Sequence, residues 1–373
     1  MNFQVDEDRA CAVALVDLPG MTPVRLGRLL DGFSPGMAWR AVAAGTHPAD
    51  RGKRFALAAR RADPVEVAGR YAAAGVRVLL PGRPGYPAAL VGDPGAPAVL
   101  CASGDPSVLE ARPAVAVVGT RSATRYGMRV ASDLGRGLAE AGVVVVSGLA
   151  LGIDAAAHAG ALAAGPGSAP PVAVVGTGLD VVYPSEHRVL WERVVSEGVV
   201  LSEAPLGTKP RPRVFPARNR IIAALSDVVV VVECHGRGGS LHTVEAAARR
   251  SIPVCAVPGG VHSPASFGTN GLLVDGCTPV RDVDDVLVAL SLARGDPAPR
   301  ATRRPDDVED HVRPEDALDR VERAVWDAVD DTPTTVETVL LRTNLSLSAL
   351  TEAGGGLADR GLLVAGAGWW ARV

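Results

Sequence analysis

Lysine, paired cysteines and long hydrophobic runs are scarce or absent in this sequence of 373 residues. Only Lys53 and Lys209 are lysines among 38 basic residues, so arginine carries nearly all the positive charge and its abundance alone says little about function. No hydrophobic run approaches the ~20 residues that would span a bilayer. We therefore expect no membrane association.

The five cysteines are odd in number, scattered, and never spaced C-x-x-C. This spacing excludes a disulfide framework and a compact zinc site. The first ten residues, MNFQVDEDRA, are acidic and do not form a signal peptide. These features indicate a reduced, cytoplasmic protein without a metal centre.

The overall charge excludes a global positive field. Lys and Arg number 38 and Asp and Glu 41, which gives a net charge of −3. Any binding of nucleic acid therefore has to come from a local patch.

At ~150 residues per domain, the length predicts two or three domains.

Residues 1–75 have apolar positions at three- and four-residue spacing, broken by Pro-Gly and Gly signals, which predicts a helical domain. The segment LPGMTP at 18–23 resembles a helix-hairpin-helix, as in SAM-like domains. Its usual second glycine is replaced by Thr22. A helical module that serves only for packing remains an equal alternative.

Residues 76–293 predict the main domain, with a Pro- and Gly-rich extended lead-in up to residue 113. Beyond it, at least six short β-branched runs alternate with helical patterns, and the runs are apolar on both faces. This alternation is typical of an α/β fold: an extended Rossmann-like, doubly wound, mostly parallel sheet.

Residues 294–318 predict an acidic, Pro-rich linker, and residues 319–373 predict a winged-helix domain of three helices and a β-wing. Its expected recognition helix, 346–360, has one cation and two acids. It also contains three glycines at 354–356, and because glycine destabilises a helix we expect this helix to end early. Residues 303–331 hold eleven acids and five arginines. Because such a surface repels phosphates, we expect a protein-interaction or regulatory module.

Small residues follow three of the predicted strands, where ligands of open α/β sheets bind. None of the turns is a G-x-G-x-x-G, so we expect no dinucleotide and no other cofactor. Their backbone N–H groups suit phosphate, although tight turns without a ligand are the alternative for each. The turns are Gly119-Thr120-Arg121, Ser147-Gly148 and Gly238-Gly239-Ser240.

Residues 204–226 contain five cations and no acid, and Phe215 lies among them. Cations interleaved with an aromatic residue suit a strand backbone and one stacked base, which predicts a single-stranded nucleic-acid groove. Cations are unfavourable at a helix start, so those near residue 220 are expected to face an anion. A solvated loop with Phe215 in the core is the alternative. The cations are Lys209, Arg211, Arg213, Arg218 and Arg220.

Catalytic patterns are missing from the sequence: there is no G-x-S-x-G, no H-E-x-x-H and no P-loop. Asp154 and His158 stand four apart on a predicted helix, where a structural role is favoured over proton transfer. Glu233 at a strand end suits an acid/base role or a role in orienting the neighbouring turn. We expect a protein that is not an enzyme.

Taken together, the motifs resemble the DNA-processing protein A family (DprA, also called Smf). The resemblance rests on ordered segments that include VAVVGTRSATRYG (115–127), VVSGLALGIDAAAHAGAL (145–162), FPARNRIIAAL (215–225) and AVPGGVHSPASFGTNGLL (256–273). It implies a dimerising Rossmann domain that binds single-stranded DNA without catalysis and helps to load RecA recombinase in recombination and natural transformation. The implied site combines Arg121 with the basic stretch that ends in Arg218, Asn219 and Arg220.

Two other functions are weighed against this one. GGSLHTVEA at 238–246, with Glu245, loosely echoes the P-G-G-x-G-T-x-x-E motif of nucleotide phosphoribohydrolases of the lysine-decarboxylase-like family. The match lacks the P-G-G start, and Ser240 replaces the second glycine. A third possibility is a structural dimer that acts through its winged helix.

Overall fold

The computed structural model describes residues 6–110, 113–212, 214–236, 238–295, 318–330, 333–360 and 362–372. The chain forms two compact units, residues 1–302 and 303–373, and each is described by itself. The predicted linker lies almost entirely outside the described residues.

Five helices build the N-terminal part of the first unit, where the periodicity of the sequence predicts them. Side-chain caps define several of their starts; the Thr22 hydroxyl, for example, accepts the Arg25 N–H of α2 at 3.3 Å. Thr22, at the position of the missing glycine, therefore serves as a helix cap. The helices are α1 (Glu7–Val16), α2 (Pro23–Leu30), α3 (Pro35–Ala44), α4 (Ala56–Arg61) and α5 (Pro64–Ala73).

A nine-stranded sheet forms the centre of this unit, in the order β1-β2-β6-β5-β4-β3-β7-β8-β9. The predicted mostly parallel α/β sheet is confirmed: all pairs from β6 to β9 are parallel. The strands are β1 (Arg77–Leu79), β2 (Leu100–Gly104), β3 (Ala114–Val118), β4 (Val144–Ser147), β5 (Val172–Val174), β6 (Val199–Ser202), β7 (Val228–Val231), β8 (Val254–Ala256) and β9 (Thr278–Pro279).

The segment expected to be only an extended lead-in also contributes to this sheet. It supplies β1 and β2, which pair antiparallel with each other, and β2 pairs antiparallel with β6. The expectation was wrong because the Pro-Gly turns of this segment interrupt strands that are too short to show a pattern. The sheet edge is thereby extended toward the N-terminal helices.

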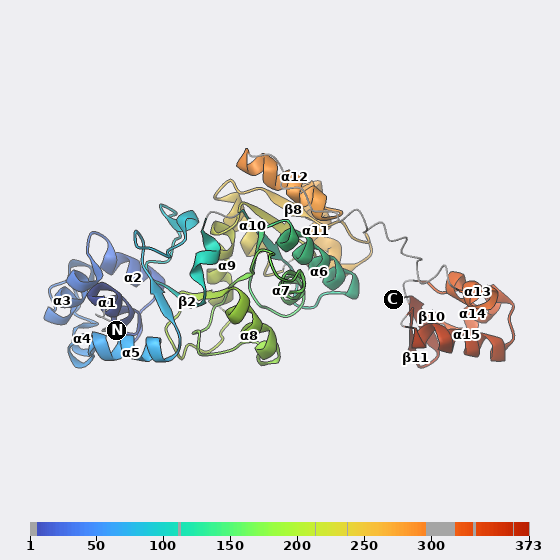
Figure 1. Cartoon of the computed structure of the whole chain (residues 1–373), viewed down its shortest axis with the longest axis horizontal. Coiled ribbons are helices and arrows are strands. Elements are labelled where there is room, and N and C mark those ends of the chain that lie inside the picture. The colour runs from blue at the N-terminus through green and yellow to red at the C-terminus, as the bar shows by residue number, and fades with distance from the viewer. Residues whose placement is uncertain are drawn as a thin grey trace. The chain divides into compact units, whose positions relative to one another are not determined.

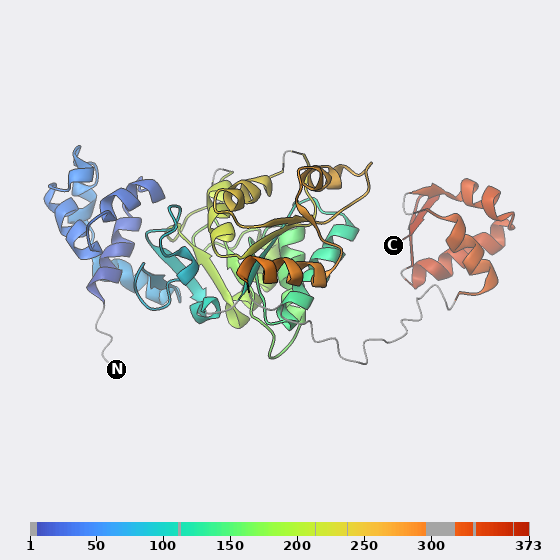
Figure 2. The same cartoon turned by 90° about the horizontal axis from the view of Figure 1, so that it is seen from above.

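Helices cover both faces of the sheet (Figures 1 and 2). Residues of α6, α7 and α12 share one hydrophobic cluster with the strands, and residues of α9, α10 and α11 share another. The helices are α6 (Arg125–Glu140), α7 (Ile153–Ala163), α8 (Arg188–Glu197), α9 (Val214–Ala224), α10 (Leu241–Ala248), α11 (Phe267–Val274) and α12 (Val283–Arg294).

The strand order reverses between β3 and β7. From β3 the chain winds through β4, β5 and β6 on one side, and then returns to place β7 on the other side of β3. Loops that leave such adjacent strands in opposite directions open a crevice at the carboxyl edge of the sheet. The fold thus provides one preferred place for a ligand, at the ends of β3 and β7.

The N-terminal helices pack against the antiparallel edge of the sheet. Their core residues form one cluster with Val99, Cys101 and Val200 of the sheet region. The Tyr71 hydroxyl of α5 donates to Asp17 at 2.8 Å and accepts the Leu206 N–H at 3.3 Å. Burial raises the pKa of this phenol, so it remains a hydrogen-bond donor at neutral pH.

The second unit combines three helices with a three-stranded antiparallel sheet of order β10-β12-β11. The expected early end of its last helix was wrong, because α15 continues through all three glycines. A Cβ on Gly354 would lie 2.3 Å from the Trp370 ring, so this glycine is needed for close packing. The elements are α13 (Arg320–Ala328), β10 (Thr334–Thr335), α14 (Val336–Thr343), α15 (Leu347–Asp359), β11 (Leu363–Gly366) and β12 (Trp369–Arg372).

Candidate nucleic-acid interface

A pocket of about 540 Å³ lies at the point where the strand order reverses. Residues after β3, the segment before α9, α9 itself and the start of α10 line it. Most of the predicted site residues are in its wall: Gly119, Thr120, Arg121, Arg211, Phe215, Arg218, Asn219, Gly238, Gly239 and Ser240.

An aromatic pair and a cation form one side of the pocket. The Phe215 and Tyr183 rings lie 5.5 Å apart between centroids, tilted by 31°. The Arg121 guanidinium lies over the Phe215 ring, 4.6 Å from its centroid. Phe215 is half-buried and Arg121 is exposed, so the alternative of a fully core-packed Phe215 does not hold. A flat π surface beside a cation is suited to a base and its phosphate.

Arg218 forms the floor of the pocket and is only 4% exposed. Its Nη1 donates to the carbonyls of Gly148, at 2.8 Å, and Val174. A Cβ on Gly148 would lie 2.4 Å from the guanidinium, so only glycine fits there. Burial lowers the pKa of Arg218 to about 10, and nearby Asp154 opposes this change. Arg218 therefore stays a cation at neutral pH.

Asp154 accepts the Gly148 N–H at 3.1 Å, and burial raises its pKa although Arg218 acts in the opposite direction. His158, one turn further on α7, is fully buried and its Nε2 lies 3.1 Å from the Val172 carbonyl. Burial lowers the pKa of His158 to about 4, so it is neutral. The two side chains thus have separate structural partners, and only Asp154 reaches the pocket.

The start of α10 presents a polar wall. The Asn219 amide donates to the Gly239 carbonyl at 3.1 Å and accepts from Arg218 Nε at 3.1 Å, which ties α9 to this turn. Ser240 is 6% exposed, and within the described part of the chain its hydroxyl has no hydrogen-bond partner. An unpaired buried hydroxyl in a pocket wall is available to a ligand.

The loop after β3 is held by Glu233, at the end of β7. This buried carboxylate accepts the Thr124 N–H at 2.9 Å and the Thr124 hydroxyl, and the Thr120 N–H donates to the Glu233 carbonyl at 2.8 Å. Thr124 in turn caps α6. Glu233 therefore positions the Gly119–Arg121 turn and is not exposed for acid/base chemistry.

Five predicted site residues lie elsewhere. Lys209 is exposed but does not line the pocket, and Arg213 falls outside the described residues. Ser147 is fully buried and donates to the Val117 carbonyl at 2.6 Å, so it does not face a ligand. Gly148 does not line the pocket, but its carbonyl accepts a hydrogen bond from Arg218 and so helps to position that side chain.

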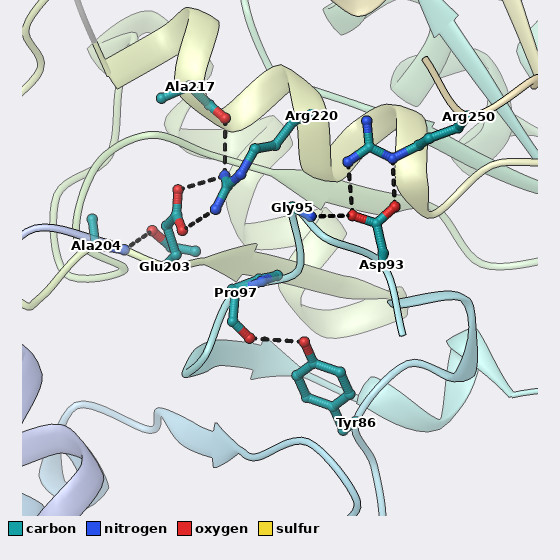
Figure 3. Close-up of polar contacts among 10 residues, drawn as sticks. Tyr86, Asp93, Gly95, Pro97, Glu203, Ala204, Ala217, Arg220 and Arg250 are labelled. Atoms are coloured by element: carbon teal, nitrogen blue, oxygen red, sulfur yellow. Dashed lines mark hydrogen bonds and ion pairs between the residues drawn. The ribbon is translucent and has the colours of Figure 1, made fainter. Parts of the chain in front are cut away.

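Arg220 also faces away from the pocket. It forms a two-point ion pair with Glu203, at 2.7 and 2.6 Å, and donates to the Ala217 carbonyl at 2.9 Å (Figure 3). The sequence suggested that the cations of this helix start face an anion. For Arg220 that anion is a carboxylate of this chain, one residue outside the acid-free segment.

Tyr183 is the aromatic residue among the pocket residues that the sequence analysis missed. It lies on the loop after β5, 32 residues before Phe215, and is 37% exposed. A tyrosine that far away gives no local signal, although Gly176-Thr177-Gly178 at the end of a strand marks the same sheet edge. Among the described residues, no group of three or more His, Cys, Asp or Glu could hold a metal ion, and no helix is long and apolar enough to cross a membrane.

Residues 77–291, which contain the sheet and the pocket, match the sequence model of the DNA recombination-mediator protein A family. The chain belongs to this family. The expected resemblance to DprA/Smf proteins is thereby confirmed. The DNA processing protein DprA of Streptococcus pneumoniae is 42% identical over 192 residues, and that of Bacillus subtilis is 37% identical over 194 residues, each match covering 52% of this chain.

Two solved structures of DprA proteins are similar to this chain. The DNA processing protein A structure from Streptococcus pneumoniae matches with a TM-score of 0.64 and 31% identity, over 76% of this chain and 98% of that one. The Helicobacter pylori protein, whose single-stranded DNA binding mode has been described, matches with a TM-score of 0.51 and 30% identity, over 60% and 97%. The chain spans 41–66% of the length of the curated relatives it matches.

Proposed function

We propose that this DprA-family protein binds single-stranded DNA without catalysis in the pocket between β3 and β7. The observation that carries the proposal is the stack of Arg121, Phe215 and Tyr183 beside the unpaired Ser240 hydroxyl. A base stacks on the rings, a phosphate pairs with the exposed guanidinium, and the hydroxyl and α10 turn contact the sugar-phosphate chain. The related Helicobacter pylori protein supports single-stranded DNA as the ligand.

The family resemblance supports a wider role. As a DprA-like protein, the chain acts as a homodimer that assists loading of RecA recombinase onto the bound strand in recombination and natural transformation. The second unit, with its helix-strand-helix-helix order and terminal hairpin, serves as a winged-helix interaction module. The N-terminal helices serve as a helix-hairpin-helix or SAM-like module.

The test is a titration of the full-length protein into a fluorescent oligothymidylate of about 16 nucleotides. Arg121, Lys209 and Arg211 are the described exposed cations at the pocket or directly before it. At ~0.7 per phosphate contact on a single strand, these three contacts alone contribute about −2 to the log–log salt slope. This is roughly a twentyfold loss of affinity between about 50 and 200 mM salt. A matched duplex should bind much more weakly, because its stacked bases cannot reach the rings.

The same preparation discriminates the rival enzyme function. Glu245, the residue that a phosphoribohydrolase would need, is largely exposed on α10 and does not line the pocket. Nucleoside monophosphates should therefore not be hydrolysed. Hydrolysis together with absent oligonucleotide binding at low salt would replace the proposed function by the enzymatic one.

A further inference from the structure

One more hollow adjoins the pocket, and a second adjoins that hollow and reaches the N-terminal helices. A hollow of about 440 Å³ shares Pro216 and His242 with the pocket. A second, of about 790 Å³, shares Pro94, Gly95 and Arg220 with the first hollow and reaches α2. We call the two together the exit groove. Its lining continues directly from the wall of the pocket.

The exit groove is lined by more cations than acids. Five arginines line it against three carboxylates: Arg28, Arg83, Arg220, Arg249 and Arg250 against Asp8, Asp31 and Glu245. Asp8 is paired with Arg83 at 3.1 Å, and Glu245 lies 3.9 Å from His242. Asp93 and Glu203 pair with Arg250 and Arg220 of this lining, so the positive charge available to a ligand lies on the arginines without such a partner.

Two ion pairs fix the floor of the exit groove (Figure 3). Arg250, just after the end of α10, pairs with Asp93 at 2.5 and 2.8 Å, and Asp93 also accepts the Gly95 N–H at 2.6 Å. Arg220 pairs with Glu203 on the neighbouring side. In both pairs the arginine side chain is the more exposed partner, 17% against 11% and 26% against 13%. The guanidinium groups therefore form more of the surface than the carboxylates do.

Arg249 and Arg28 are exposed, and in the described part of the chain neither side chain has an ion-pair or hydrogen-bond partner. Arg249 lines the hollow next to the pocket and Arg28 lines the one against the N-terminal helices. Unpaired cations spaced along a groove are what a polyanion leaving the pocket requires.

We propose that a single DNA strand, after stacking in the pocket, continues through the exit groove past Arg249 to Arg28. The N-terminal helices are then part of the strand-binding surface. This inference rests on the proposed function and adds to it the path of the strand. It assigns the two free arginines to phosphates that a short oligonucleotide does not have.

The test compares oligothymidylates of about 5 and about 16 nucleotides on the full-length protein. For the variant Arg249→Ala/Arg28→Ala, the salt slope with the longer strand should be shallower by about 1.4, at ~0.7 per lost contact. The slope with the shorter strand should not change. Arg249→Ala alone should give half of this change.

The matched control is Arg51→Ala/Arg61→Ala. These arginines are also exposed, lie on the N-terminal helical part and line neither the pocket nor the exit groove, so both slopes should stay as in the wild type. An unchanged long-strand slope in Arg249→Ala/Arg28→Ala, with normal short-strand binding, overturns the path but keeps the proposed function. Failure of the wild-type protein to bind either strand overturns both.

Discussion

The Arg121 guanidinium lies 4.6 Å from the centroid of the Phe215 ring, although Arg121 follows β3 and Phe215 lies in the first turn of α9, nearly a hundred positions later in the chain. Tyr183 adds a second ring 5.5 Å from the first. The cation holds one face of Phe215 in place. The site therefore exists before a ligand arrives, which reduces the ordering cost of binding.

Phe215→Ala should weaken binding of single-stranded DNA by roughly five- to 150-fold, because stacking of a base on an aromatic ring contributes ~1–3 kcal/mol. Fluorescence anisotropy with an oligothymidylate measures the effect. Phe215→Trp keeps a stacking surface and should retain most of the affinity. Equal losses in both variants would contradict a stacking role.

Arg121→Ala should make the salt slope shallower by about 0.7, since one phosphate contact is lost. Arg121→Lys should restore the slope, because the charge remains. It should not restore full affinity, because an ammonium group lacks the planar surface that stacks on Phe215. Salt titrations of both variants separate the two contributions, and identical behaviour of Ala and Lys would argue against a phosphate contact.

Arg218→Ala should lower the free energy of unfolding by about 3–5 kcal/mol, because it leaves two buried carbonyls and Asp154 without their cationic partner. Chemical denaturation measures this loss. Arg211→Ala is the matched control: this arginine is exposed in the same pocket, so stability should change by less than about 0.5 kcal/mol. Equal stability of the two variants would disprove the anchoring role of Arg218.

Ser240→Ala should leave the free energy of unfolding within about 0.5 kcal/mol of the wild type, since the hydroxyl has no partner within the described structure. DNA affinity should fall roughly two- to twelvefold, the contribution of one hydrogen bond of ~0.5–1.5 kcal/mol. Ser122→Ala, at an exposed position outside the pocket wall, should change neither quantity. A loss of stability without a loss of affinity would assign Ser240 to folding alone.

His158 should make the protein less stable in acid. Its pKa is about 4 when folded and ~6.5 when unfolded, so between these values only the unfolded chain binds the proton. The free energy of unfolding should therefore fall as the pH drops through this window, by about 3 kcal/mol in total. His158→Gln should have a shallower pH dependence from pH 6.5 to 4 in denaturation curves. An identical pH dependence would show that another group is responsible.

Much of the fold could be predicted from local sequence pattern. Apolar runs such as residues 228–232, separated by helical periodicity, require a parallel sheet covered on both faces, because each run is hydrophobic on both sides. The position of the pocket follows in part from the same pattern, since the turns at 119–121 and 238–240 both follow strands. The pairing of β1 with β2 could not be predicted from the sequence. Strands of three and five residues beside Pro-Gly turns are too short to show an alternation of apolar and polar residues.

The sequence by itself determined that cations gather around Phe215 and that small residues end the strands, since both are properties of neighbouring residues. Only the tertiary structure decided which cations are free. Arg211 and Arg220 look alike in the sequence, yet Glu203 neutralises Arg220 and the core encloses Arg218. The contact of Tyr183 with Phe215 in the pocket, and the close packing of Trp370 on Gly354, are likewise visible only in the folded structure. Pairing and burial depend on residues that are distant in the chain and meet only when the sheet and helices pack.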